Sequence, residues 1–195
     1  MWVKICGITN LEDALCALSC GANALGFVFY PKSPRYITPQ NAQKIAKQLP
    51  LHVKKIGLFV EVTPDEINLT CKLAKMDIAQ IHFEVDDAFL RALKVPYLRV
   101  IRAKEETDVE KYSGTLRLVD AFVESFGGEG KRLDLSWFTK SDNNNIILAG
   151  GLNPDNIVGL KALGFYGVDV SSGVEKSKGI KDHEKMKAFI QRAKA

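Results

Sequence analysis

Short apolar runs alternate with longer segments of helical periodicity along the whole chain, and this repeated order limits the possible folds more than any other feature. The apolar runs are rich in Val, Ile and Phe, and they predict strands at 3–6, 24–29, 55–60, 78–82, 97–101, 116–120, 146–149 and 166–170. Helices are predicted at 11–19, 39–48, 64–75, 86–93, 107–111, 135–139, 154–163 and 182–193. Several of these begin with a capping residue before proline, as at Thr38-Pro39, Thr63-Pro64 and Asn153-Pro154.

Strand and helix units that alternate in this way over 195 residues predict a closed parallel (β/α)₈ barrel, the TIM barrel, as a single domain over residues 1–195. Such a barrel needs about 200 residues at its smallest. The alternative is an open, doubly wound α/β sheet. The first strand-to-helix turn, Cys6-Gly7-Ile8-Thr9, lacks the G-x-G-x-x-G spacing of a dinucleotide-binding sheet, which favours the barrel.

Charge and composition exclude several classes of partner. The net charge is +4, but the lysines are scattered and form no basic run with aromatics, so no nucleic-acid partner is expected. No apolar run approaches the roughly 18 to 20 residues that span a bilayer, and no signal core is present, so we expect no membrane partner and a cytoplasmic protein. The spacing of Cys6, Cys16, Cys20 and Cys71 predicts neither a disulfide framework nor a metal site.

Three chemically useful side chains fall at the ends of predicted strands, where barrel enzymes carry their catalytic groups. They are Cys6, His82 and Asp120. Each alone has an ordinary structural interpretation, as a buried thiol, a core histidine or an acid that caps a loop. Together, a thiol and a carboxyl on different strands can face one another across the barrel mouth, as a base and an acid must do. Cys6 would need surroundings that favour the thiolate, and Asp120 would need a raised pKa.

Glycine-containing loops after the last two strands predict a phosphate site. In such barrels the loops after strands seven and eight commonly bind phosphate. Glycines let backbone N–H groups approach an anion closely, and serine hydroxyls add donors. A glycine pair alone can equally serve a turn into a helix, so the prediction depends on both loops together. The residues are Gly150, Gly151, Ser171, Ser172 and Gly173.

Two further loops have two interpretations each. Arg35 lies in Pro31-Lys32-Ser33-Pro34-Arg35-Tyr36, where two positive charges are held between prolines; it either binds a ligand carboxylate or belongs to a solvated basic turn. The glycine-rich segment 124–131 either closes over a substrate or only connects two elements.

Seven segments then identify a family resemblance. In this order and spacing they resemble phosphoribosylanthranilate isomerases over nearly the whole chain: KICGIT (4–9), GFVFYPKSPRYI (26–37), QIH (80–82), LVD (118–120), GGEGK (127–131), AGGLNPDNI (149–157) and VDVSSGVE (168–175). The resemblance implies an Amadori rearrangement of tryptophan biosynthesis, without a cofactor. N-(5-phosphoribosyl)anthranilate would become 1-(2-carboxyphenylamino)-1-deoxyribulose 5-phosphate.

The resemblance also implies roles for single residues. Asp120 would be the general acid that protonates the furanose ring oxygen, and Cys6 the general base that removes the C2 proton. Arg35 would bind the anthranilate carboxylate, Asp169 would lie near the sugar hydroxyls, and His82 would support the site or touch the substrate. The family's phosphate-binding loops match Gly150, Gly151, Ser171, Ser172 and Gly173.

Departures from the family pattern leave substrate breadth open. Phe83 stands where the family commonly has glycine, Ala121-Phe122 is apolar where a polar residue is usual, and Leu133-Asp134-Leu135-Ser136 replaces F-D-W-S. Another phosphosugar barrel isomerase or synthase is one alternative. Histidine-pathway isomerases pair two aspartates, whereas the pair here is Cys6 and Asp120; the synthase needs a lysine at a strand end, and no lysine stands at these predicted strand ends. A non-catalytic phosphate-ligand sensor is the other. The expected partner is a phosphosugar substrate, bound by a monomer or a homodimer.

Overall fold

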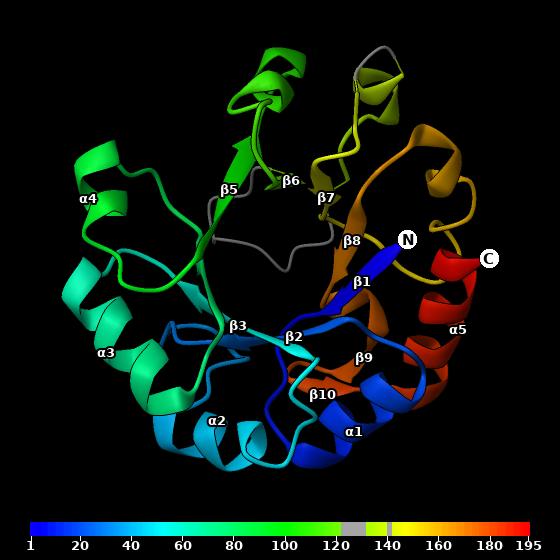
Figure 1. The fold of residues 1–195 in the computed structure, drawn as a ribbon. Coiled ribbons are helices and arrows are strands. Elements are labelled where there is room, and N and C mark those ends of the chain that lie inside the picture. The colour runs from blue at the N-terminus through cyan, green and yellow to red at the C-terminus, as the bar shows by residue number, and fades with distance from the viewer. Residues whose placement is uncertain (122–131, 140–141) are drawn as a thin grey trace.

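The computed structural model describes residues 1–121, 132–139 and 142–195, and its centre is a closed barrel of parallel strands in sequence order (Figure 1). Pairing of β1 with β8 closes the barrel, which confirms the predicted fold class and excludes the alternative of an open, doubly wound sheet. Each predicted strand is present, and no end is shifted by more than two residues. The strands are β1 (Trp2–Ile5), β2 (Ala24–Val28), β3 (Lys54–Phe59), β4 (Ile78–Ile81), β5 (Tyr97–Ala103), β6 (Arg117–Ala121), β7 (Ile146–Leu148) and β8 (Gly167–Val170).

Helices surround the barrel on the outside (Figure 1). Their starts follow from local chemistry, because a capping side chain satisfies amides that have no partner within the helix. Thr38 accepts a hydrogen bond from a backbone amide in the first turn of α2, and Thr63 and Glu66 cap α3 reciprocally. These two predicted starts are confirmed. The α-helices are α1 (Leu11–Ser19), α2 (Pro39–Ala46), α3 (Pro64–Ala74), α4 (Asp87–Arg91) and α5 (His183–Lys194).

Three predicted helices are wrong in type. Segments 107–111, 135–139 and 154–163 contain only the short 3₁₀ helices η1 (Glu106–Glu110), η2 (Leu135–Phe138) and η3 (Leu160–Leu163). After β7, the side chain of Asn153 accepts from the backbone N–H of Asp155 and of Asn156, at 2.9 and 3.1 Å, so Asn153-Pro154 begins a turn instead of a helix. Gly159, with φ 88°, then interrupts any helical path.

A small hairpin that the sequence did not predict lies between β8 and α5. It follows η4 (Ser172–Val174) and consists of the antiparallel strands β9 (Glu175–Ser177) and β10 (Ile180–Lys181), which are too short for a period-two signal. At its turn, the Thr9 hydroxyl donates to the carbonyl oxygen of Gly179 at 2.6 Å. The hairpin is thereby attached to the loop that follows β1.

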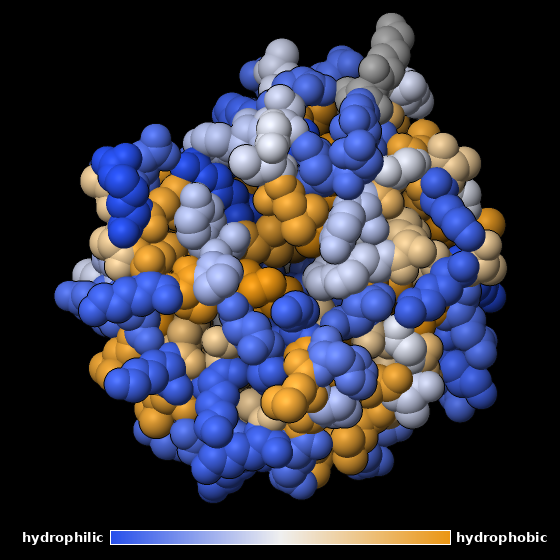
Figure 2. Space-filling view, viewed as in Figure 1, coloured by the Kyte–Doolittle hydropathy of each residue, from blue (hydrophilic) through white to orange (hydrophobic). Residues whose placement is uncertain are grey.

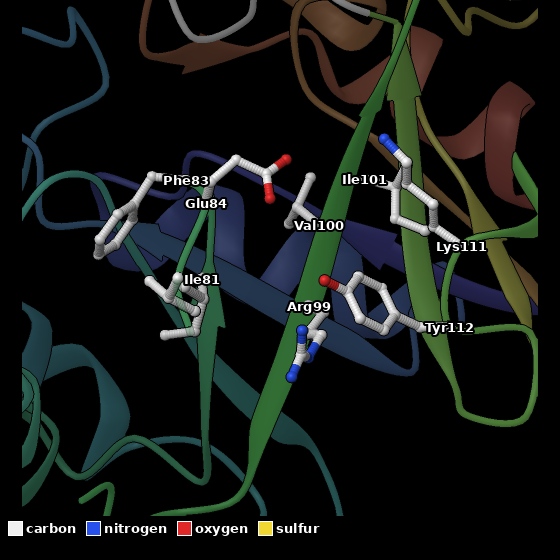
Figure 3. Close-up of a pocket in the computed structure, with 9 residues that line it drawn as sticks. Ile81, Phe83, Glu84, Arg99, Val100, Ile101, Lys111 and Tyr112 are labelled. Atoms are coloured by element: carbon white, nitrogen blue, oxygen red, sulfur yellow. The ribbon is translucent and has the colours of Figure 1, made fainter. Parts of the chain in front are cut away.

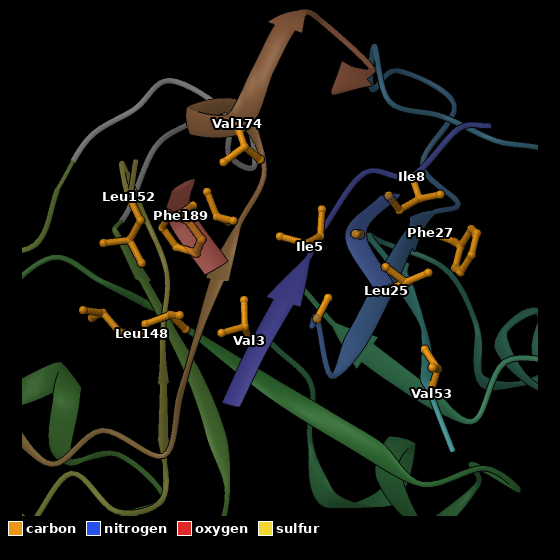
Figure 4. Packing of buried hydrophobic residues seen from close by; sticks show 14 of the residues in the cluster. Val3, Ile5, Ile8, Leu25, Phe27, Val53, Leu148, Leu152, Val174 and Phe189 are labelled. Atoms are coloured by element: carbon orange, nitrogen blue, oxygen red, sulfur yellow. The ribbon is translucent and has the colours of Figure 1, made fainter. Parts of the chain in front are cut away.

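Apolar residues form two cores, because side chains alternate between the two faces of each strand. The larger core lies between the strands and the helices and includes Ile5, Phe27 and Phe189 (Figure 4). The smaller fills the barrel interior. Its buried residues are Leu98, Val100, Leu118, Ile147 and Ala149.

Hydrophilic side chains cover much of the outer rim of the face in Figure 2, with apolar side chains in patches between them. Within the part of the chain that the structure describes, none of the helices combines the length and the apolar character needed to cross a bilayer.

Candidate active site

Ionisable side chains from five strands meet inside the barrel at the carboxyl ends of the strands. Cys6 follows β1 directly, His82 follows β4, and Asp120 and Asp169 lie in β6 and β8. Arg102 of β5 pairs in register with Asp120, so the two side chains share a face. The charges of Asp169 and Arg102 both act on the Asp120 carboxyl, and that of Asp169 acts on the Cys6 thiol. The structure therefore brings the predicted strand-end residues into one electrostatic environment.

Lys4 forms the buried ion pair at the centre of this group. Its ammonium lies 3.0 and 3.1 Å from the two carboxylate oxygens of Asp169, and its side chain is 0% exposed. Burial alone lowers the pKa of Lys4, but Asp169 and Cys6 more than offset burial and raise it. A Cβ atom on Gly26 would lie 3.0 Å from Lys4 Cε and 2.8 Å from Cys6 Sγ, so the lysine and the thiol adjoin the same backbone.

We expect Asp169→Ala to destabilise the fold, because it leaves the Lys4 ammonium buried without its carboxylate. Removing one partner of a buried ion pair costs about 3–5 kcal/mol in the free energy of unfolding. Urea unfolding followed by circular dichroism measures the loss. The matched control is Asp155→Ala, which breaks the Asp155–Arg192 pair, whose carboxylate side chain is 92% exposed, and should change little. Equal effects of the two substitutions would contradict this account of Lys4.

Asp120 has the property that a general acid at neutral pH requires. Burial raises the pKa of its carboxyl to about 7, and the negative charge of Asp169 contributes in the same direction. The backbone N–H of Ala121 and the charges of Arg102 and Lys4 offset part of this rise. The carboxyl is therefore protonated in a large fraction of molecules near neutrality.

Cys6 is held as a thiol. Burial raises its pKa above the ordinary value, Asp169 raises it further, and Lys4 and Lys181 act in the opposite direction. The requirement that its surroundings favour the thiolate is therefore not met. The adjacent lysines lower the cost of forming a thiolate, but the resting group carries its proton.

His82 is neutral. Burial, and then the charges of Arg102 and Lys4, lower the pKa of its imidazole to about 3. The ring is nearly fully buried, and its Nδ1 has no hydrogen-bond partner among the described residues. A neutral ring of this kind does not supply protons at physiological pH.

Arg35 lies beside the loop that follows Cys6. Its side-chain stem crosses Gly7, where an added Cβ would come within 2.7 Å of Arg35 Cδ and 3.0 Å of Ser171 Oγ. The backbone at Gly7 has φ 76°, so glycine is required there for both conformation and space. The residue is 8% exposed, and its guanidinium is bound by Glu175. The interpretation of a solvated basic turn is therefore wrong for Arg35, although Lys32 in the same loop is exposed.

The two glycine loops predicted to bind phosphate are in contact. A Cβ atom on Gly173 would lie 1.8 Å from the carbonyl oxygen of Leu152, so the loop after β8 packs on the backbone of the loop after β7. Gly150 and Gly151 have φ of 89° and 60°, and the Asn156 side chain donates to the Gly151 carbonyl at 2.9 Å. The loops therefore form one structural unit.

Gly173→Ala is expected to separate these loops, because a methyl group cannot occupy the space of a backbone carbonyl. Such overpacking typically costs about 1–3 kcal/mol, and we expect weaker binding of inorganic phosphate as well. Thermal unfolding and isothermal titration calorimetry with phosphate test both effects. Gly114→Ala is the control, since nothing lies within 4 Å of a Cβ at Gly114. Unchanged stability and phosphate binding in the Gly173 variant would show that the loop contact is unimportant.

Sequence reasoning missed four charged residues of this site: Lys4, Arg102, Glu175 and Lys181. Lys4 stands two positions before Cys6, so strand alternation could have placed both on one face. Arg102 was missed because the predicted strand ended at residue 101, whereas β5 continues to Ala103. Lys181 had no comparable signal, because its hairpin was not predicted. The segment 124–131 and Phe122 lie outside the described residues.

Phe83, which follows His82 in the chain, lines a pocket of its own. The pocket is located between β4, β5 and the segment after η1, and Glu84, Lys111 and Tyr112 are among the residues that line it (Figure 3). None of the predicted site residues lines it. The ring of Phe83 packs edge-on against Phe89 of α4, with 5.5 Å between ring centroids. This departure from the family pattern is thus accommodated beside α4.

A closed parallel barrel with ionisable side chains and glycine turns at the carboxyl ends of its strands defines the class of (β/α)₈-barrel enzymes. A family model described as N-(5'phosphoribosyl)anthranilate (PRA) isomerase matches residues 3–192. The chain belongs to the phosphoribosylanthranilate isomerase family, which confirms the resemblance found in the sequence.

Individual relatives agree. N-(5'-phosphoribosyl)anthranilate isomerase from Nitratiruptor sp. is 55% identical over 194 residues, covering 100% of this chain and 99% of that protein. The crystal structure of the Thermotoga maritima isomerase has a TM-score of 0.92 and 38% identity, covering 100% and 98% of the two chains. An isomerase in complex with reduced 1-(o-carboxyphenylamino)-1-deoxyribulose 5-phosphate has a TM-score of 0.86, 38% identity and the same coverage. Another structure contains monomers of the dimeric T. maritima isomerase (TM-score 0.86, 36% identity, the same coverage), so both states occur among the relatives.

Proposed function

We propose that this chain converts N-(5-phosphoribosyl)anthranilate to 1-(2-carboxyphenylamino)-1-deoxyribulose 5-phosphate, with Asp120 as general acid and Cys6 as general base. Membership of the isomerase family supports the reaction. The observation that carries the residue assignment is the shared site at the strand ends, where the pKa of Asp120 is about 7 and a thiol lies beside the buried Lys4. We also propose that the chain works as a single barrel domain, monomeric or dimeric, in the cytoplasm.

The proposed reaction begins with proton transfer from Asp120 to the furanose ring oxygen. The bond from C1 to the ring oxygen breaks, and the nitrogen lone pair forms an iminium. Cys6, as thiolate, removes the C2 proton, and the electron pair of that C–H bond neutralises the iminium to give an enolamine. The enolamine then takes a proton at C1 and loses the proton of its C2 hydroxyl, which yields the ketone and restores both groups.

Binding is assigned to the groups around this pair. Arg35 binds the anthranilate carboxylate, Asp169 lies near the sugar hydroxyls, and His82 supports the wall of the site. The phosphate binds at the joined loops after β7 and β8, through Gly150, Gly151, Ser171, Ser172 and Gly173. Contact between those loops and the position of Arg35 beside Ser171 support this arrangement.

The alternatives are less well supported. A lysine-dependent synthase would need a catalytic lysine at a strand end. A lysine does lie in the site, but Lys4 is inside β1, one residue before the strand ends at Ile5, and Asp169 holds it in an ion pair. Asp169 is likewise engaged by that ion pair, so Asp120 and Asp169 do not form two equivalent acids. A non-catalytic sensor would bind the phosphosugar without converting it.

The decisive experiment supplies N-(5-phosphoribosyl)anthranilate to the purified protein. Loss of substrate fluorescence is followed against spontaneous breakdown, and chromatography identifies the ketose. Conversion well above the blank is expected. Binding of the reduced product analogue without any conversion would support the sensor and refute the proposal.

A further inference from the structure

Arg35, Glu175 and Lys181 form a compact ionic group, called here the Arg35 cluster. Arg35 Nε donates to Glu175 Oε1 and Arg35 Nη2 donates to Glu175 Oε2, each at 2.8 Å. The ammonium of Lys181 lies 3.0 Å from the same Glu175 Oε1. The side chains are 10%, 5% and 0% exposed, respectively, so the cluster is buried.

The way in which Glu175 binds Arg35 fixes the edge that the guanidinium presents. A bidentate pair through Nε and Nη2 occupies one edge of the planar group and holds its orientation. No hydrogen bond joins Nη1 to any described residue. The edge formed by Nη1 and Nη2 therefore stays available for a second carboxylate, because a guanidinium carries more N–H donors than one carboxylate can use.

The charges of the cluster do not balance. Two cations share one carboxylate, which leaves one more positive than negative charge in a buried place. Burial lowers the pKa of Lys181 even though Glu175 acts to raise it. An uncompensated buried charge is costly, so this site favours an incoming anionic group.

Short connections hold the cluster between the two ends of the proposed substrate site. Lys181 also donates to the carbonyl oxygen of Ser171, at 3.2 Å, in the loop proposed to bind phosphate. The backbone N–H of Lys181 donates to the buried carboxylate of Asp13 in α1, at 2.9 Å. Glu175 and Lys181 pair across the β9–β10 hairpin, whose turn is bound by Thr9. The hairpin thus fixes the Glu175 carboxylate against the Nε and Nη2 edge of the Arg35 guanidinium.

We infer that Glu175 is a positioning residue that orients the Arg35 guanidinium toward the carboxylate of the substrate's aromatic ring, with Lys181 holding Glu175 in place. The inference rests on the proposed function and extends it to substrate specificity. Glu175 does not touch the reacting atoms. It prevents the flexible arginine from turning away and so reduces the entropy lost when the carboxylate binds.

The test uses Glu175→Gln and two substrates: N-(5-phosphoribosyl)anthranilate and N-(5-phosphoribosyl)aniline, which lacks the carboxylate. For the carboxylate substrate we expect KM to rise about tenfold or more, equivalent to about 1.4 kcal/mol, with kcat changed less than about threefold. For the aniline substrate, the variant and the wild type should have nearly equal KM. In an Arg35→Met background, Glu175→Gln should add little, because both changes remove the same interaction.

Glu184→Gln is the matched control, since Glu184 is an exposed acid in the first turn of α5 and should change neither KM. Glu175→Asp keeps the charge with a shorter side chain; it should give a smaller selective rise in KM, and it serves as the test if the Gln variant does not fold. An equal rise in KM for both substrates, or no rise for either, overturns the inference. A wild type that converts neither substrate would instead refute the proposed function, so the two failures are distinguishable.

Discussion

Replacing Asp120 with asparagine is expected to reduce kcat for the rearrangement by about 10²–10⁴-fold, the range typical for loss of a general acid. The amide keeps the shape of the carboxyl, but it is far too weak an acid to protonate the ring oxygen. Binding of the reduced product analogue should persist, because Arg35 and the glycine loops are assigned to binding. Steady-state kinetics and calorimetry of the same preparation separate the two effects.

The pH dependence of kcat/KM gives a second readout of Asp120. The acid must be protonated, which is favoured below its pKa of about 7, and the base must be a thiolate, which is favoured above the raised pKa of Cys6. The product of these two fractions rises with pH up to about 7, stays level, and falls above the pKa of Cys6. In Asp120→Asn the level region should disappear, and the remaining activity should rise steadily with thiolate formation. An unchanged profile in the variant would exclude Asp120 as the acid.

Cys6→Ser should be comparably severe, with kcat reduced by about 10²–10⁴-fold. A serine hydroxyl fits the same space, but it ionises at far higher pH than a thiol, so it cannot take the C2 proton effectively. Deuterium at C2 of the substrate supplies the diagnostic measurement. If removal of this proton limits the rate in the variant, we expect a larger isotope effect on kcat than in the wild type.

The control for Cys6 is Cys71→Ala, which removes another buried thiol. Cys71 belongs to α3 and packs in the outer core, and burial raises its pKa to about 12. Its loss should lower stability without a specific effect on kcat. A Cys6→Ser enzyme that remains as fast as the wild type would leave the substrate and the fold in place but reject Cys6 as the base.

The two residues should also behave as a unit. The charges of Asp169 and Lys4 act on both groups, and the proposed reaction needs both, so once one is lost the other has less left to contribute. The double variant is therefore expected to lose much less than the product of the two single losses.

Most of the fold could be predicted from the sequence because its signals are local. Apolar runs of strand length recur between helical segments, and capping residues before proline mark helix starts such as that of α3. The errors occurred where local signals misled. Asn153-Pro154 resembles a helix start, but its side chain closes a turn, and the strands of the β9–β10 hairpin are too short to show a period.

The candidate site was predicted in part. Strand ends pointed to Cys6, His82 and Asp120, and the family resemblance added Arg35 and Asp169. Glu175 is the last residue of the matching segment 168–175, but no role was assigned to it from the sequence. Nothing in the sequence indicated that it would lie against Arg35, 140 positions away along the chain. Such a contact depends on how the last hairpin packs on the first loops.

The sequence by itself determined the alternation of strands and helices, the barrel class, and which residue types stand at the strand ends, because each depends on neighbours within a few positions. Only the tertiary structure decided the protonation of these groups and their ion pairs. Burial raises the pKa of Asp120 to about 7, Lys4 pairs with Asp169 across 165 positions, and Glu175 holds Arg35. Desolvation and Coulomb interactions depend on distances in space, which exist only once the barrel has closed.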